Sequence, residues 1–374
     1  MASSSRKSGR EQSRKRPGSI SRKTPAARSQ TKSPAARSRA RSASSRARRV
    51  SPAALKGSTC VLVLGMHRSG TSVVTRGLKA LGVYLGDSLL GPAPDNPKGY
   101  WERRETFELN EEIMAALDRP WSDSRPISPE TWDRRELDEL KERAASLLVD
   151  LFEGQELWGF KDPRTIRVFP FWRDVLDRLG PSVSIILAIR PPQSAISSLV
   201  TRDGMPVADA EALWLEYMLP WLPDIATYPV VVVDFDRLVG SPLRQLRRIA
   251  KHLGVTIDPT DPEITEYTKG FVDRGLRHHV QPAESRSGDD EHSTLADEAY
   301  AALLKLTRSR ASWRRSVELA HRYRATMLDN DRYLAKGRAR RAQAGTHEKA
   351  ADALPRPPPS RQERHDDYAA AGSG

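Results

Sequence analysis

The sequence predicts an α/β fold: a P-loop-type parallel β-sheet flanked by helices, with a C-terminal helical extension and disordered tails. Four short apolar runs, 60–65, 157–161, 183–190 and 229–234, alternate with segments of helical periodicity, as in a parallel sheet. The last two runs are rich in Val, Ile and Leu, which is typical of strands buried on both faces. The first run leads into a glycine-rich loop and then into an amphipathic helix.

The expected helices are marked by apolar residues three or four positions apart. The marker residues are Val74, Leu78 and Leu81 in the first helix, Leu109, Ile113 and Leu117 in a second, and Leu243, Leu246, Ile249 and Leu253 in a third. Gly82 and Gly254 directly follow the first and third helices, where glycine commonly ends a helix. From 295 to about 337 the chain is expected to form one or two further helices.

The positive charge of the chain is concentrated at its N-terminus. The 374 residues carry a formal net charge of +13, but residues 1–56 alone hold 17 Lys or Arg against one acid, Glu11. Subtracting this +16 from the total leaves −3 for the rest. Segment 1–56 has too few apolar residues to offset its ordering entropy, so we expect a disordered basic tail. Such a tail could bind nucleic acid or an acidic membrane surface, or it could serve as an organelle-targeting segment. The alternative is an extension with no dedicated role.

The remaining organisation follows from composition. Residues 57–337 are expected to form the α/β domain, with 283–337 as its helical extension, and 338–374 a second disordered tail. The single cysteine, Cys60, excludes an internal disulfide and suits a reducing compartment. No apolar run approaches the roughly 20 residues of a membrane span, and no signal peptide is recognisable. These features predict a soluble, cytoplasmic protein without a transmembrane segment.

The loop at 65–72 fits a phosphate-binding pattern with one departure. Gly65, Gly70 and Ser72 match the sequence Gly, four residues, Gly, Lys, Ser or Thr, but Thr71 stands where the lysine belongs. A cation, Arg68, lies inside the loop instead. Backbone N–H groups and a helix N-terminus remain able to bind phosphate. Without the lysine that reaches the outer phosphates of ATP or GTP, the loop favours another phosphate-bearing donor.

Three further groups of polar residues follow or connect the strands. Arg190 ends the third apolar run, and Ser198 lies on the helix after it. One interpretation is that the two residues form a second anion site. The alternative is that Arg190 forms an ion pair at the surface. Lys161 ends the second run and Asp162 follows it, at the edge where a parallel sheet binds its ligands. Asp162 would bind a metal or pair with a neighbouring cation. Glu102 follows the loop that begins at Asn96 and is either a general base or a solvated glutamate.

These motifs, in this order, resemble the bacterial branch of the PAPS-dependent sulfotransferase family, PAPS being 3′-phosphoadenosine 5′-phosphosulfate. The resemblance covers residues 58–282. It implies that the first loop binds the 5′-phosphosulfate, and that Arg190 and Ser198 bind the 3′-phosphate. It also implies a late cofactor lid at 271–279, from which Arg277 would reach the 3′-phosphate. The cofactor contacts implied for the first loop are Gly65, His67, Arg68, Ser69, Gly70, Thr71 and Ser72, with packing as the alternative role of His67.

Roles in catalysis follow from a more distant resemblance to tyrosylprotein sulfotransferases. These have an arginine like Arg68, a Lys-Asp-Pro like that beginning at Lys161, and a glutamate base, for which Glu102 is the candidate by position. Cytosolic small-molecule sulfotransferases use a histidine base near the third strand instead, and this chain has none there. The resemblance implies metal-free, in-line sulfuryl transfer from PAPS, with Arg68 and Lys161 stabilising the transferred group.

The acceptor and two rival functions stay open at this point. Loops 86–104, 120–135 and 204–228, with Trp101, Trp121 and Trp221, are expected to shape a pocket for a small-molecule, carbohydrate or glycolipid acceptor. One rival is a P-loop kinase or NTPase using ATP and Mg²⁺, since the run ending at Asp234 resembles a Walker-B strand. The other is a polyanion-binding protein acting through the basic tail.

Overall fold

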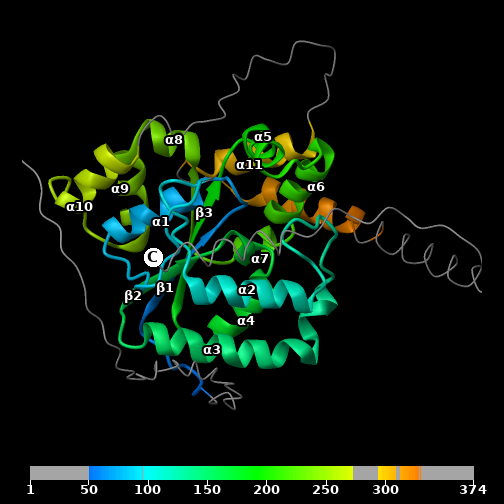
Figure 1. Cartoon of the computed structure of the whole chain (residues 1–374), viewed down its shortest axis with the longest axis horizontal. Helices are drawn as coiled ribbons and strands as arrows, with labels where there is room; N and C mark the ends of the chain where they lie inside the picture. Colours follow the sequence, from blue (N-terminus) through cyan, green and yellow to red (C-terminus); the bar gives the residue numbers. More distant parts are fainter. Residues whose placement is uncertain (1–49, 95, 273–293, 309–311, 328, 330–374) are drawn as a thin grey trace, which may run out of the picture. The chain divides into compact units, whose positions relative to one another are not determined.

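The computed structural model describes residues 50–94, 96–272, 294–308, 312–327 and 329. A four-stranded parallel sheet forms its centre, in the order β2-β1-β3-β4; Figure 1 labels the first three of these strands. The strands are β1 (Thr59–Leu64), β2 (Leu157–Lys161), β3 (Ser182–Ile189) and β4 (Val230–Asp234). The four predicted strands and their parallel arrangement are thus confirmed, with bounds shifted by one residue at most.

The register of the sheet brings the ligand-binding ends of the strands together. Val63 of β1 pairs with Lys161 at the end of β2, and Leu64 pairs with Leu187 of β3. Asp234, the last residue of β4, pairs with Ile189. The polar residues that follow these strands therefore emerge at one edge of the sheet, as parallel strands require.

One face of the sheet packs against the helices that follow the phosphate loop and β4. Alternate strand residues such as Val63, Ala188 and Val233 point into this layer and are fully or almost fully buried. The elements of this layer are α1 (Thr71–Ala80), α8 (Phe235–Gly240), α9 (Pro242–Leu253), α10 (Pro262–Thr265) and the π-helical turn η4 (Glu266–Phe271). Figure 1 shows α1, α8, α9 and α10 together on one side of the strands.

The opposite face supports the larger part of the core. Leu62, Trp158 and Leu187 are among the strand residues that point into it. Its helices are α2 (Arg104–Ala116), α3 (Asp138–Phe152), α4 (Phe169–Leu179), α5 (Pro192–Asp203), α6 (Val207–Met218), α7 (Leu222–Ile225) and α11 (Leu295–Lys305). Three 3-10 turns connect them, η1 (Pro129–Asp133), η2 (Arg135–Leu137) and η3 (Pro163–Ile166). Burial on both faces explains why the strand sequences are almost continuously apolar.

Helical residues 314–327 follow α11 and pack onto the same core, where the hydroxyl of Tyr323 donates a hydrogen bond to the Glu216 carboxylate at 3.1 Å. The predicted helical extension thus contains two helices among the described residues. At the other end, the packed chain begins earlier than the expected boundary at 57. Leu55 is buried, and its N–H donates to the carbonyl of Leu179 at 2.9 Å. Residues 1–49 and 330–374, to which the tail predictions refer, lie outside the described residues.

Candidate functional site

The phosphate loop turns sharply between β1 and α1, and two glycines make the turn possible. Gly65 has φ 146°, and a Cβ there would lie 2.5 Å from the carbonyl oxygen of Ala188 in β3. Gly70, with φ 85°, is the N-cap of α1, and a Cβ there would overlap the ring of Phe235. The two glycines of the motif are therefore required by close packing and by backbone conformation. Arg68 also has a positive φ, 65°, which is unusual for a residue with a side chain.

The N-terminus of α1 is suited to an anion. No side chain caps it, and its first turn contains no acidic residue. Its first N–H groups and the positive end of the helix dipole consequently face the loop without competition from a carboxylate. Beside them the Ser69 hydroxyl is buried and has no hydrogen-bond partner among the described residues. This chemistry fits a phosphate or sulfate group.

Arg68 connects the loop to the second predicted anion site. Its Nε donates to Ser198 Oγ at 2.8 Å, and its carbonyl accepts from Arg190 Nη1 at 3.3 Å. Arg190 directly follows β3, and its guanidinium stacks on the ring of Phe235, 4.6 Å from the centroid. Ser198 lies on the second turn of α5 and is buried. Arg68 thus meets two residues that are 122 and 130 positions further along the chain, at the carboxyl edge of the sheet.

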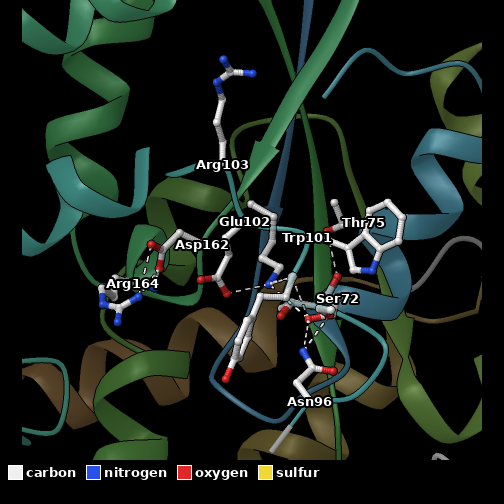
Figure 2. A network of polar contacts seen from close by, with 12 residues as sticks. Ser72, Thr75, Asn96, Trp101, Glu102, Arg103, Asp162 and Arg164 are labelled. Atoms are coloured by element: carbon white, nitrogen blue, oxygen red, sulfur yellow. Dashed lines mark hydrogen bonds and ion pairs between the residues drawn. The ribbon is translucent and has the colours of Figure 1, made fainter. Parts of the chain in front are cut away.

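Lys161 is the centre of a second polar network, of which Figure 2 labels Ser72, Asn96 and Glu102. Its ammonium, 1% exposed, donates to Glu102 Oε1 at 2.8 Å, to the carbonyl of Tyr100 at 2.6 Å and to Ser72 Oγ at 3.3 Å. Ser72 in turn donates to the carbonyl of Tyr100 at 2.9 Å, and Asn96 Nδ2 lies 3.4 Å from Ser72 Oγ. The loop after Asn96 is therefore held against the N-terminus of α1 and the end of β2.

Glu102 is not a solvated loop glutamate, because only 6% of the residue is exposed. Burial raises the pKa of its carboxyl, and the ammonium of Lys161 opposes this effect. Asp162 behaves differently: its carboxylate accepts from the backbone N–H of Arg164 at 2.7 Å and forms an ion pair with the guanidinium of Arg164 at 3.1 Å. Asp162 thus begins the turn η3 and pairs with a neighbouring cation, Arg164.

The ring of His67 contacts two aromatic rings and lies near several cationic side chains. Its ring is 4.8 Å from that of Trp121 and 5.4 Å from that of Tyr217, and its Nε2 has no hydrogen-bond partner among the described residues. Burial and the nearby charges of Arg164, Arg202, Lys161 and Arg68 hold the pKa of this histidine well below its usual range. The imidazole is therefore neutral at neutral pH.

The three tryptophans proposed for an acceptor pocket lie in different surroundings. Trp121 contacts His67 in the loop, as described above. Trp221 is buried and donates to the carbonyl of Arg167 at 2.9 Å, so that it belongs to the core. Trp101 packs against α1, where the guanidinium of Arg76 lies over its ring, 5.6 Å from the centroid. The carbonyl of Tyr100 was not predicted from the sequence, because a backbone acceptor leaves no sequence signal.

Two further predictions concern Arg277 and Asp234. Arg277 lies outside the described residues. Asp234 caps α8: its Oδ1 accepts from the N–H of Arg237 at 2.9 Å, and its Oδ2 accepts from the hydroxyl of Tyr300 at 2.9 Å, an arrangement that does not favour a Walker-B role. The part of the chain that the structure describes contains no cluster of three His, Cys, Asp or Glu side chains arranged to hold a metal ion, and none of its helices is long and apolar enough to cross a membrane.

A glycine-rich loop and the cations Lys161 and Arg190 thus meet at the carboxyl edge of a parallel sheet, the edge at which such sheets generally bind ligands. A family model described as the sulfotransferase family matches residues 60–259, more than half of the chain. The chain belongs to the PAPS-dependent sulfotransferase family and is an enzyme of that class. The family assignment therefore takes the place of the two rival functions, which were a kinase or NTPase and a polyanion-binding protein acting through its tail.

Solved structures that the chain resembles are also sulfotransferases. The sulfotransferase domain of the Synechococcus PCC 7002 olefin synthase is 17% identical, over 72% of this chain and 95% of that domain, with a TM-score of 0.37. The sulfotransferase domain of the curacin biosynthetic pathway is 16% identical, over 57% and 79%, with a TM-score of 0.34. The sulfotransferase STF1 of Mycobacterium tuberculosis is 17% identical, over 57% and 71%, with a TM-score of 0.34. No curated protein matches the chain.

Proposed function

We propose that this enzyme transfers the sulfuryl group of PAPS to a hydroxyl or amine of a small-molecule or carbohydrate acceptor, by in-line transfer without a metal. The observation that carries the proposal is the contact of Arg68 with both Ser198 and Arg190, at 2.8 and 3.3 Å. It joins a loop suited to the 5′-phosphosulfate to a cation and a hydroxyl suited to a 3′-phosphate. A donor with phosphates at both positions is PAPS rather than ATP.

The residues present fit PAPS in charge and in hydrogen-bond donors. The uncapped N-terminus of α1, the Ser69 hydroxyl and Arg68 provide donors for the 5′-phosphosulfate. Arg190 and Ser198 provide donors for the 3′-phosphate. The stacking of Arg190 on Phe235 fixes the plane of its guanidinium, so that less side-chain entropy is lost on binding.

The chemistry then requires stabilisation of negative charge and removal of one proton. Bound PAPS supplies the sulfuryl group: its S–O bond to the 5′-phosphate breaks as a bond from sulfur to the acceptor oxygen or nitrogen forms, and PAP leaves. Lys161 and Arg68 stabilise the charge on the transferred and bridging oxygens. Glu102 accepts the acceptor proton, a role favoured by a pKa that burial raises above its usual range.

The side of the site where the acceptor binds is best indicated by His67. Its neutral imidazole, with Nε2 unpartnered among the described residues, is available to bind an acceptor hydroxyl, and the ring of Trp121 adjoins it at 4.8 Å. An aromatic ring next to a polar group suits the apolar face and hydroxyl edge of a sugar or a hydroxylated small molecule. We therefore place the acceptor at loop 120–135 rather than beside Trp101 or Trp221.

Thermal shift with PAP tests the proposal. PAP should stabilise the full chain in the presence of EDTA, because a ligand that binds only the folded state raises the unfolding temperature. The Arg190→Ala variant should lose about 1.5–3 kcal/mol of PAP binding, the range for charge-assisted hydrogen bonds, or roughly 10- to 150-fold in affinity. Arg143→Ala, which removes an exposed arginine of α3, is the matched control and should bind normally. Stabilisation by ATP with Mg²⁺ but not by PAP would exclude the proposal.

A further inference from the structure

We propose that helix α11 positions the residues assigned to the 3′-phosphate of PAPS, with Tyr300 and Asp297 as its positioning residues. This role of α11 rests on the proposed function, because it requires that Arg190 and Ser198 bind this phosphate. α11 lies outside residues 60–259, which the family model matches. It nevertheless forms polar contacts with the segments that follow β3 and β4, and these two segments build the 3′-phosphate site.

One face of α11 packs onto the core beside the donor site. Ala296, Ala299 and Leu303 are at most 1% exposed and recur at the spacing that places them on one side of a helix. They belong to the same core cluster as Ile189, the last residue of β3. α11 also contacts α5, and Figure 1 shows the two helices next to each other. The helix is therefore held near the end of β3, which Arg190 directly follows.

The first polar contact of α11 reaches the segment after β4. The hydroxyl of Tyr300 donates to Asp234 Oδ2 at 2.9 Å, while Asp234 Oδ1 accepts from the N–H of Arg237 at 2.9 Å. Asp234 is the N-cap of α8 and is only 2% exposed, so both of its oxygens require donors from the protein. Arg237 also donates from Nη1 to Oγ1 of Thr307, just beyond α11, at 2.6 Å. Tyr300 thus fixes the carboxylate that begins α8.

The start of α8 is linked to the donor site through Phe235. This residue is the first of α8, directly after the capping aspartate, and the guanidinium of Arg190 lies over its ring, 4.6 Å from the centroid. The ring also packs against Gly70 of the phosphate loop, where an added Cβ would overlap it. A shift of the first residues of α8 would therefore move the ring against which Arg190 packs.

The second polar contact of α11 reaches the segment after β3. Gln193 Nε2 donates to Asp297 Oδ1, and Gln193 lies in the first turn of α5, between Arg190 and Ser198 in the sequence. The other oxygen of Asp297 accepts from the hydroxyl of Thr294, the N-cap of α11, at 3.2 Å. α11 thus connects the start of α5 with the start of α8. Fixing the two phosphate-binding side chains before the ligand arrives lowers the entropy lost on binding, so α11 adds affinity without touching the ligand.

Calorimetric titration of the full chain with PAP tests the role of α11. Tyr300→Phe keeps the ring and removes only the hydroxyl, and it should weaken PAP binding roughly 5- to 30-fold, a part of what the loss of one charge-assisted hydrogen bond can cause. Tyr323→Phe is the matched control, because it removes a tyrosine hydroxyl that donates to another buried carboxylate, that of Glu216 in α6, at 3.1 Å. α6 carries none of the proposed donor residues, so this variant should bind PAP within about twofold of the unmodified chain.

Two more measurements separate positioning from a general effect on stability. AMP, which lacks the 3′-phosphate, should lose less affinity than PAP when Tyr300 is replaced by phenylalanine. Gln193→Met removes the donor to Asp297 and should also weaken PAP binding, whereas Asp297→Asn keeps a carbonyl oxygen for Gln193 Nε2 and should bind PAP normally.

The outcomes that would overturn this role of α11 differ from those that would exclude the proposed function. Unchanged PAP affinity in Tyr300→Phe or in Gln193→Met, an equal loss in Tyr323→Phe, or equal losses for AMP and PAP would each overturn it. If Arg190→Ala weakens PAP binding in the same titrations, the proposed function stands without α11. An unmodified chain that does not bind PAP would exclude both.

Discussion

The buried pair of Lys161 and Glu102 allows the sharpest prediction. Both side chains are inaccessible, 1% and 7% exposed, and their charged atoms lie 2.8 Å apart. Removing one partner leaves an uncompensated buried charge, which costs about 3–5 kcal/mol, whereas removing both is close to neutral. We therefore expect Lys161→Met and Glu102→Gln each to destabilise the fold strongly, and the double variant to be more stable than either single variant.

The expected size is measurable. A loss of about 3–5 kcal/mol lowers the unfolding temperature of a domain of this size by roughly 6–20 °C. Urea unfolding of the full chain, followed by circular dichroism, gives the free energies of the four proteins in the double-mutant cycle. Lys141→Met is the matched control, because Lys141 pairs with Asp174 at the same distance, 2.8 Å, but both side chains are partly exposed, and it should cost less than about 1 kcal/mol. Additive losses at Lys161 and Glu102 would refute the reasoning.

Activity separates the catalytic role of the pair from its structural one. The double variant, although refolded to near-normal stability, should transfer the sulfuryl group at least about 10²-fold more slowly, the usual effect of removing one group that stabilises transition-state charge. The readout is transfer of labelled sulfate from PAPS at saturating donor. A double variant with unchanged kcat would show that neither side chain takes part in the reaction.

Three other predictions concern the loop, a buried carboxyl and the second anion site. Gly65→Ala should lower the free energy of unfolding by about 1–3 kcal/mol more than Gly82→Ala does. Both glycines have positive φ, but only a Cβ at Gly65 would meet a carbonyl of β3. Equal losses of unfolding free energy would contradict this explanation. Burial raises the pKa of Glu216 to about 7, so between pH 4.5 and 7 the folded state holds a proton that the unfolded state releases. The free energy of unfolding should therefore fall by up to about 3 kcal/mol as the pH rises from 4.5 to 7. Urea unfolding across that range should show no such dependence for Glu216→Gln. Ser198→Ala should weaken PAP binding roughly 2- to 10-fold in a thermal-shift titration while Ser197→Ala should not, and the reverse order would exclude Ser198 from the site.

The sheet and the loop were predictable because their signals are local. A buried parallel strand is apolar over its whole length, and the glycines of the loop are fixed by the turn that they make. The position of each charged residue at a strand end followed from the same rule. Residues 50–56 were misplaced because their composition resembles the tail, whereas the contact of Leu55 with the end of α4 is tertiary.

The roles of single polar residues were less predictable, because they depend on contacts between distant segments. From the sequence Glu102 was either a base or a solvated glutamate, whereas its carboxylate lies buried beside Lys161, 59 residues further along the chain. The three tryptophans were equivalent in sequence, yet Trp221 lies in the core and Trp121 beside His67. Whether a side chain is buried, and which residue it contacts, depends on the whole fold and cannot be inferred from the residue alone.

The contact between Lys161 and Glu102 has a consequence for the proposed transfer step. While Glu102 is ionised, its charge neutralises much of the ammonium beside it, so the resting site contains a paired charge rather than a free cation. Uptake of the acceptor proton by Glu102 removes that negative charge and leaves Lys161 to interact with the oxygens of the transferred group. The cation therefore becomes most effective as the acceptor becomes nucleophilic, which is the differential stabilisation of the transition state that accelerates a reaction. A glutamine at 102 would leave Lys161 permanently unneutralised and would remove this coupling, even where PAP still binds.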